Sequence, residues 1–211
     1  MRKVSPKIND LIKEELNLQP DYDFQFFIPK PLQRITLYYI YDIHEKDKSL
    51  VLSKLLTIGF KDKKLSNVFA TSTVKFFGNY KDELVVLVGD FDEELRLLNQ
   101  DIKSVMHKLN EEYEIKDGAE LYDVTKSEKF SYLPHLGLGR IRTQSIKNNI
   151  KDPSQVEAVF DRIRMRIMEL LTNMLKDEKS LKLPIITYGI LQFPDRNYVK
   201  WFGPEPVRIK Y

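Results

Sequence analysis

Residues 132–142 read Tyr-Leu-Pro-His-Leu-Gly-Leu-Gly-Arg-Ile-Arg and predict a β-strand that carries a histidine near its start. Alternate side chains of a strand share a face, so His135, Gly137 and Gly139 are expected on one side. The apolar residues of the stretch predict the buried side: Leu136, Leu138 and Ile141. Proline is tolerated just before a strand because its missing N–H matters least there. Two glycines beside a titratable imidazole leave room for a ligand to approach the backbone.

The composition is typical of a globular protein with one large domain or two tightly packed lobes. Its 211 residues are 42% hydrophobic and 31% charged, which supports a sizeable core beneath a well-solvated surface. The net charge of +3 permits an anionic partner but is low for a dedicated nucleic-acid coat protein. There is no cysteine, so disulfides and thiolate metal sites are excluded. No apolar signal-peptide core or membrane span is visible, and we expect a cytoplasmic protein without a membrane partner.

Hydrophobic periodicity predicts a mixture of helices and strands, which defines the α+β class. Helices are expected within residues 1–20, at 50–58, at 95–109 with Asp90 and Glu93 as a capping box, and from Asp152 onward. Strands are expected at 34–42, 67–77, 83–89 and 119–125, at the His135 stretch, and at 185–193, 198–202 and 207–210. The turn-rich residues 78–82 predict that the two strands they join form an antiparallel pair.

The sequence Pro-His-Leu-Gly-Leu-Gly-Arg at residues 134–140 resembles the second signature of the two-histidine phosphoesterases. This superfamily includes the 2′-5′ RNA ligases and cyclic phosphodiesterases, and the usual form of its signature is Pro-His-apolar-Thr-apolar-Gly/Ala-Arg. Gly137 therefore stands where the family has threonine or serine. Residues 31–37, Pro-Leu-Gln-Arg-Ile-Thr-Leu, resemble the first signature. There Arg34 takes the position of the first histidine, and Thr36 keeps the hydroxyl position.

The resemblance implies an α+β fold of two similar lobes, with antiparallel sheets around a central cleft and helices on the outside. Residues 73–88 are similar to the family's middle hairpin. We expect residues 1–211 to form a single domain of this type, with lobes near residues 24–90 and 91–211 and an N-terminal helix within residues 1–20. In the family, each lobe contributes one signature strand to the shared cleft.

The resemblance also implies a chemistry. In the family, two histidines exchange protons with the attacking and leaving oxygens of a phosphodiester, and two hydroxyls hold phosphate oxygens without a metal. His135 would then be the sole acid–base residue here, and Thr36 a hydrogen-bond donor to the phosphate. Arg34 cannot exchange a proton near neutral pH, but its planar fork suits a phosphate.

Three further residues complete the expected site. Arg140 and Arg142 follow the second signature and are expected at the cleft rim, where they can contact a nucleic-acid backbone. Tyr132 precedes the signature and offers an aromatic surface for a base. The implied partner is an RNA end or a small nucleotide with a phosphodiester or a 2′,3′-cyclic phosphate. No metal or organic cofactor is implied, and a monomer is favoured.

Three functions stay open because the first histidine is missing. They are a metal-independent phosphodiesterase, a catalytically inactive RNA- or nucleotide-binding module, and an interaction protein with a silent cleft. A lone histidine in a strand is more often a packing residue than a catalyst, and Arg34 is equally explained as an ion-pair partner at a strand edge. His44 lies roughly 33 Å from Arg34 along an extended strand, and His107 is expected to be an ordinary surface or boundary residue.

Two other groups have ordinary explanations. Arg162, Arg164 and Arg166 are predicted to form a solvated helix face. Tyr38 and Phe77 belong to predicted strands, where aromatic residues are more often core residues than surfaces for base stacking.

Overall fold

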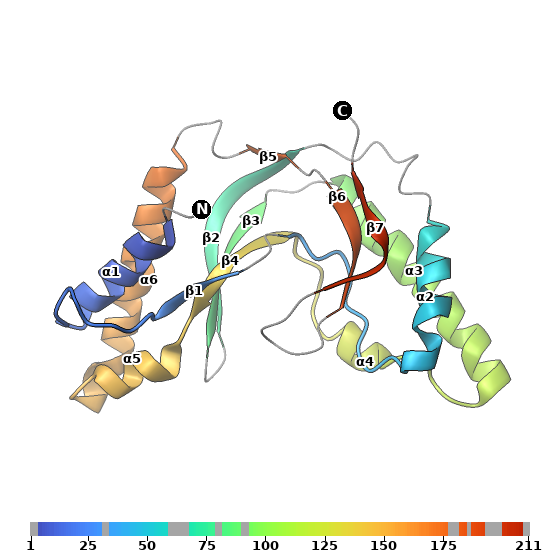
Figure 1. The fold of residues 1–211 in the computed structure, drawn as a ribbon, viewed down its shortest axis with the longest axis horizontal. Coiled ribbons are helices and arrows are strands. Elements are labelled where there is room, and N and C mark those ends of the chain that lie inside the picture. The colour runs from blue at the N-terminus through green and yellow to red at the C-terminus, as the bar shows by residue number, and fades with distance from the viewer. Residues whose placement is uncertain are drawn as a thin grey trace. The chain divides into compact units, whose positions relative to one another are not determined.

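A computed structural model describes residues 4–30, 34–58, 68–78, 82–89, 93–176, 182–184, 187–192 and 200–208 (Figure 1). The chain divides into two compact units. Unit 1 comprises Met1–Ile35, Ala70–Asp90 and His135–Lys182, and unit 2 comprises Thr36–Phe69, Phe91–Pro134 and Leu183–Tyr211. These units alternate along the chain, whereas the lobes expected from the sequence were two consecutive segments.

Unit 1 is built around a sheet whose strands follow the order β1-β4-β3-β2-β5. The strands are β1 (Phe27–Pro29), β2 (Val68–Gly78), β3 (Glu83–Gly89), β4 (His135–Ile141) and β5 (Lys182–Pro184). The pairs β1–β4, β4–β3 and β3–β2 are all antiparallel. The predicted hairpin of β2 and β3 is therefore confirmed, and so is the predicted strand that begins at His135.

β4 does not alternate regularly because it contains a β-bulge. Val86 of β3 pairs with Gly137, and the next residue, Val85, pairs with Gly139. Leu138 is the extra residue between these two pairs, and an extra residue reverses the alternation beyond it. The bulge also explains why the apolar pattern of the sequence changes phase towards Ile141.

The bulge decides which side chains share a face of the sheet. His135 and Gly137 stay on one face, as predicted, but Arg140 joins them in place of Gly139. The prediction that Gly139 lies beside His135 is wrong. Gly139 instead faces the ring of Phe27 on β1, because a Cβ atom at this glycine would lie 2.3 Å from the Phe27 Cζ.

The other face of this sheet is covered by α1 (Val4–Glu15) and α6 (Val156–Met174), which lie side by side (Figure 1). Both helices bury apolar residues at helical spacing, among them Ile8 and Ile12 of α1 and Ile163 and Ile167 of α6. Two shorter helical segments, α5 (Thr143–Asn149) and η2 (Pro153–Gln155), connect β4 to α6. The Asp152 side chain accepts a hydrogen bond from the Ser154 N–H at 2.9 Å, so the predicted helix start is confirmed.

The arginines of α6 are partly exposed, and they also make ion pairs that the prediction of a solvated face did not include. Arg164 Nε donates to Glu83 Oε1 of β3 at 2.9 Å, and Glu83 is buried. Arg162 and Arg166 make ion pairs with Glu15 of α1 at 3.1 and 2.8 Å. The arginines therefore connect α6 to α1 and to the sheet.

Unit 2 contains three helices, η1 (Glu45–Asp47) and a separate two-stranded sheet within the described part of the chain. The helices are α2 (Lys48–Leu56), α3 (Glu93–Asp117) and α4 (Val124–Ser127), and the strands are β6 (Thr187–Gln192) and β7 (Lys200–Arg208). A buried apolar cluster joins α2, α3 and the segment after α3: Val51, Leu55, Leu98, Ile102, Met106, Leu109, Leu121 and Tyr122. The helices predicted at 50–58 and 95–109 are confirmed, although α3 extends further at its C-terminal end.

Two predicted strands are absent from the structure. Residues 34–42 form no strand apart from a single bridge between Ile35 and Leu136. Some of their polar backbone groups bond to side chains instead, as the carbonyl of Leu37 does with Asn99 Nδ2 at 2.6 Å. Residues 119–125 are also not a strand, because Asp123 caps the short helix α4 there.

In the tail, the strands predicted at 198–202 and 207–210 correspond to one strand, β7. The predicted cap residue Asp90 lies outside the described residues. No helix in the described ranges has the length and apolar character that crossing a membrane requires.

Candidate functional site

The candidate site lies on the face of β4 that carries His135 and Gly137. The bridge between Ile35 and Leu136 is antiparallel, so the residue before Ile35 is opposite the residue after Leu136. Arg34 therefore lies opposite Gly137, on the same face as His135. This arrangement brings the arginine of the first signature beside the glycine of the second.

Lys30 occupies the space that the missing side chain of Gly137 leaves open. A Cβ atom at Gly137 would lie 2.8 Å from the Lys30 Nζ and 2.9 Å from its Cδ. The Lys30 backbone N–H donates to the Leu138 carbonyl at 3.1 Å, which continues the pairing of β1 with β4. The lysine ammonium thus lies over the position where the family signature has a hydroxyl.

Lys30 is absent from the residues predicted from the sequence. The signal that points to it is the glycine at position 137, since a glycine on a strand face leaves space for a long side chain from the neighbouring strand. That neighbour could not be identified from the sequence, because the register of β1 against β4 depends on pairing between distant segments.

Three cationic groups gather at this point: Lys30, Arg34 and Arg140. Burial and the nearby charges of Arg34 and Arg140 together lower the pKa of the half-buried Lys30 to about 8, with burial as the largest cause. Arg140 Nη1 also lies 4.0 Å from Asp82 Oδ2, in a partly exposed ion pair of small energetic weight. The repulsion among the three cations favours an anion at this place.

His135 stands at the edge of this cluster and contacts an aromatic ring. Its half-buried imidazole packs edge-on against Phe77 of β2, with ring centroids 5.4 Å apart and an interplanar angle of 90°. Such a contact restricts the orientation of the imidazole. We refer to Lys30, Arg34, Phe77, His135 and Arg140 as the basic face of unit 1.

The other predicted site residues are Arg142, Thr36 and Tyr132. Arg142 is one residue beyond β4, and its guanidinium lies over the ring of Phe24 at 5.4 Å from the centroid. Thr36 and Tyr132 are half-buried residues of unit 2. The structure thus brings together His135, Arg34 and Arg140 from the predicted set, and it adds Lys30 and Phe77.

The fold of this chain resembles that of a solved protein structure. The structure of Usb1 from Kluyveromyces marxianus with uridine monophosphate superposes on this chain with a TM-score of 0.53 and 10% sequence identity. The match covers 88% of this chain and 85% of that chain. This chain shares the fold of Usb1.

A second structure of Kluyveromyces marxianus Usb1 has a TM-score of 0.49 and 9% identity, over 88% of this chain and 84% of that chain. No protein-family model matches the chain, and no curated protein matches it in sequence. The predicted α+β class is confirmed by the mixture of helices and antiparallel sheet and by the fold shared with Usb1. At 10% identity the comparison concerns the fold alone, and the roles of the signature residues are predictions.

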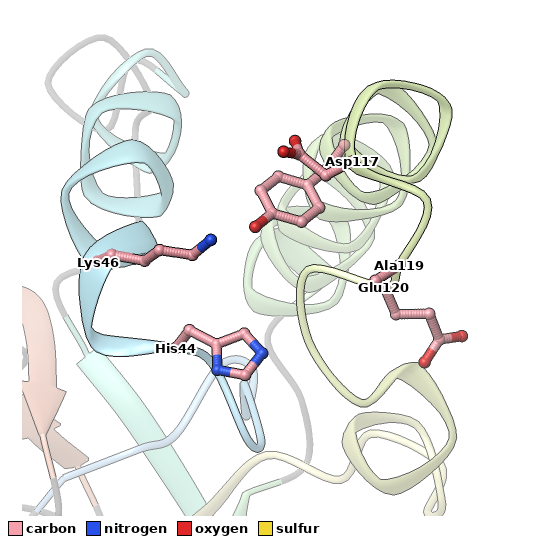
Figure 2. Close-up of a pocket in the computed structure, with 6 residues that line it drawn as sticks. His44, Lys46, Asp117, Ala119 and Glu120 are labelled. Carbon is pink, nitrogen blue, oxygen red and sulfur yellow. The ribbon is translucent and has the colours of Figure 1, made fainter.

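The other two histidines are separate from the basic face. His107 of α3 is half-buried and pairs with Glu128, which also binds Lys103, so it is the ordinary boundary residue that we predicted. His44 lines a surface hollow of about 470 Å³ in unit 2 (Figure 2). Figure 2 shows His44 and Lys46 extending towards the end of α3, whereas the carboxylate of Glu120 points away. Within the described residues, no acidic and histidine side chains cluster in a way that could hold a metal ion.

Replacing Lys30 by methionine is expected to stabilise the protein at pH 7. The native pKa of Lys30 is about 8, against 10.5 for an ordinary lysine, so between these values the unfolded chain binds more protons. The native state of the wild type therefore carries a penalty that is complete below pH 8 and disappears as the pH rises through 10.5. Urea unfolding should show a higher midpoint for Lys30→Met at pH 7 and a much smaller difference at pH 10.

Lys7→Met is the matched control for this experiment, because Lys7 is an exposed lysine of α1. It should change the urea midpoint little at either pH. A Lys30→Met variant that is less stable than the wild type at pH 7 would show that the ammonium is stabilised by its surroundings.

Proposed function

We propose that the basic face of unit 1 binds the phosphate of an RNA end or a small nucleotide that carries a phosphodiester or a 2′,3′-cyclic phosphate. The observation that carries this proposal is the lysine ammonium held over Gly137, with Arg34 and Arg140 as its charged neighbours and His135 next along the strand. A phosphate group removes the repulsion among these cations and accepts hydrogen bonds from each of them.

The individual roles follow from side-chain chemistry. Arg34 offers two parallel N–H donors to two phosphate oxygens, which a lysine cannot do. Arg140 adds charge from the same face of β4, and Phe77 supplies an aromatic surface beside His135 for a base. Thr36 and Tyr132 are proposed as further contacts, on the strength of the signature alone. The phosphate-binding groups are all side chains of this chain, and the proposal requires no metal or cofactor.

The comparison supports the nucleotide as ligand class. Usb1, whose fold this chain shares, has been solved with uridine monophosphate. A nucleoside monophosphate combines the two elements that the basic face can recognise, since its phosphate suits the cations and its base suits an aromatic ring.

The test is calorimetric titration with uridine monophosphate, uridine 2′,3′-cyclic monophosphate and uridine. We expect the two phosphates to bind, with affinities that fall as salt rises, and uridine to bind far more weakly. Arg34→Met should weaken phosphate binding by about 10- to 100-fold, because a hydrogen bond to a charged group contributes about 1.5–3 kcal/mol.

Two comparisons make this result specific. Arg34→Lys keeps the charge but loses the fork, so it should recover only part of the affinity. Lys7→Met removes one positive charge from an exposed position and should bind like the wild type. Equal binding of uridine and uridine monophosphate, or no binding of either, would contradict the proposal and favour an interaction protein.

A further inference from the structure

We propose that Lys30 is the second proton-transfer residue of the basic face, and that with His135 it makes this site a metal-independent phosphodiesterase. This inference rests on the proposed function, because it needs a phosphate bound on the same face. It goes beyond the signatures, neither of which includes a lysine. It also answers the difficulty that Arg34, at the place of the first histidine, cannot exchange a proton near neutral pH.

The position of Lys30 suits a partner of His135. Its Nζ lies over Gly137, two residues from His135 on the same face of β4. Two residues of a strand span roughly 7 Å. In the reaction, the attacking and leaving oxygens lie on opposite sides of the phosphorus atom, so the two proton-transfer groups must also be some distance apart. Groups at this separation can each reach one of the two oxygens within hydrogen-bond distance.

The lysine backbone is held where this role requires it. Lys30 directly follows β1, and its N–H bonds to the Leu138 carbonyl at 3.1 Å. At the other end of β1, the Phe26 N–H donates to Asn9 Oδ1 of α1 at 2.7 Å. A proton donor fixed on a paired backbone segment keeps its reach and direction better than one on a free loop.

The electrostatic surroundings make this lysine a stronger acid than usual. Among the described residues, the charged and titratable groups on this face of unit 1 are Arg34, Arg140 with its partner Asp82, His135, and Lys75 of β2. Burial, Arg34 and Arg140 bring the pKa of Lys30 to about 8, so at pH 7 the group is protonated and yet gives up its proton readily. An acid works best when its pKa lies near the operating pH.

The reaction is the hydrolysis of a 2′,3′-cyclic phosphate. The oxygen of a water molecule forms a bond to phosphorus while His135 accepts the proton of that water. The bond between phosphorus and one ribose oxygen breaks, and Lys30 donates its proton to that oxygen. The product is a nucleoside monophosphate, with an imidazolium at His135 and a neutral amine at Lys30. Proton exchange with solvent then returns both groups to their starting states.

The inference also accounts for the glycine in the second signature. A threonine or serine at position 137 would place its Cβ within 3.0 Å of three atoms of the Lys30 side chain. The hydroxyl and the lysine therefore exclude each other at this position. In this chain, Lys30 can lie beside His135 because position 137 carries no hydroxyl side chain.

The experiment measures hydrolysis of uridine 2′,3′-cyclic monophosphate in EDTA from pH 6 to pH 10, together with binding of uridine monophosphate. In the wild type we expect the rate to fall about tenfold per pH unit above pH 8, because Lys30 loses its proton. Lys30→Arg keeps the charge but cannot donate a proton, so turnover should fall at least 100-fold while binding changes less than threefold. His135→Ala should lose turnover to a similar extent.

A second variant tests the position of the ammonium without removing it. Gly137→Ala pushes aside only the flexible end of Lys30, so turnover should fall at least tenfold with an unchanged melting temperature. Lys7→Arg is the control that should match the wild type in rate and in pH profile. If Lys30→Arg hydrolyses the substrate at the wild-type rate, or keeps the decline above pH 8, Lys30 is not the acid.

The failures of the two proposals can be told apart. A wild-type protein that binds uridine monophosphate but hydrolyses nothing overturns the role of Lys30 and leaves the phosphate site intact. A protein that does neither overturns both. If Lys30→Arg no longer binds uridine monophosphate, and its turnover falls only as much as its binding, then Lys30 is a phosphate ligand and not the proton donor.

Discussion

Arg164→Met is expected to lower the free energy of unfolding by about 3 kcal/mol. The Arg164 guanidinium donates to Glu83 at 2.9 Å, and the Glu83 side chain is only 5% exposed. Removing the arginine leaves a carboxylate buried on β3 without its charged partner, which is far more costly than losing an exposed ion pair. Urea unfolding of the variant and the wild type measures this difference directly.

The same helix supplies the control for this prediction. Arg162→Met removes an arginine whose side chain is 48% exposed in its pair with Glu15, so it should cost less than 1 kcal/mol. The double variant Glu83→Leu/Arg164→Met replaces the pair with apolar side chains and should regain most of the stability lost in Arg164→Met. Equal costs for the two arginine variants would show that the burial of Glu83 is not what matters.

Gly139→Ala is expected to destabilise the protein by about 3 kcal/mol, at the upper end of the usual range for overpacking. The added Cβ would lie 2.3 Å from the Phe27 Cζ and 2.6 Å from the carbonyl oxygen of Ile28. The carbonyl belongs to the backbone of β1, so it cannot rotate away as a side chain can. The variant can fold only if β1 and β4 move apart, and thermal unfolding should show a clear loss of stability.

Gly137→Ala provides the matched control on the same strand. Its added Cβ would meet only the Lys30 side chain, whose end can move, so its cost should be below 1 kcal/mol. If the two alanine variants lose the same stability, the close approach of Phe27 and Ile28 to Gly139 does not limit the packing of β1 on β4.

Local patterns were sufficient where the structure depends on neighbouring residues. The alternating stretch at His135 predicted β4, and the turn-rich residues before Glu83 predicted the hairpin of β2 and β3. Helical spacing of apolar residues predicted α3 and α6, because one stripe of each helix is buried. These elements need only their own periodicity to be recognised.

Local patterns failed where distant groups compete for the same backbone. The β-branched and aromatic residues of 34–42 predicted a strand, but Asn99 and Ser127 bond to that backbone through their side chains. The change of phase between Leu138 and Ile141 was visible in the sequence, but the residue at which the strand bulges was not. The bulge appears only when β4 is paired with β3, and it exchanges Gly139 for Arg140 on the face of His135.

The sequence by itself determined the α+β class and the strand that presents His135, since both follow from the order and spacing of nearby residues. It also carries the resemblance to the two phosphoesterase signatures, in which Arg34 and Gly137 differ from the usual residues. Only the tertiary structure decided which side chain lies at Gly137, because it places Lys30 of a distant segment in the space above Gly137 and close to Arg34. The register between β1 and β4 creates that contact, and register is set by pairing and packing across the whole of unit 1 rather than by either stretch alone.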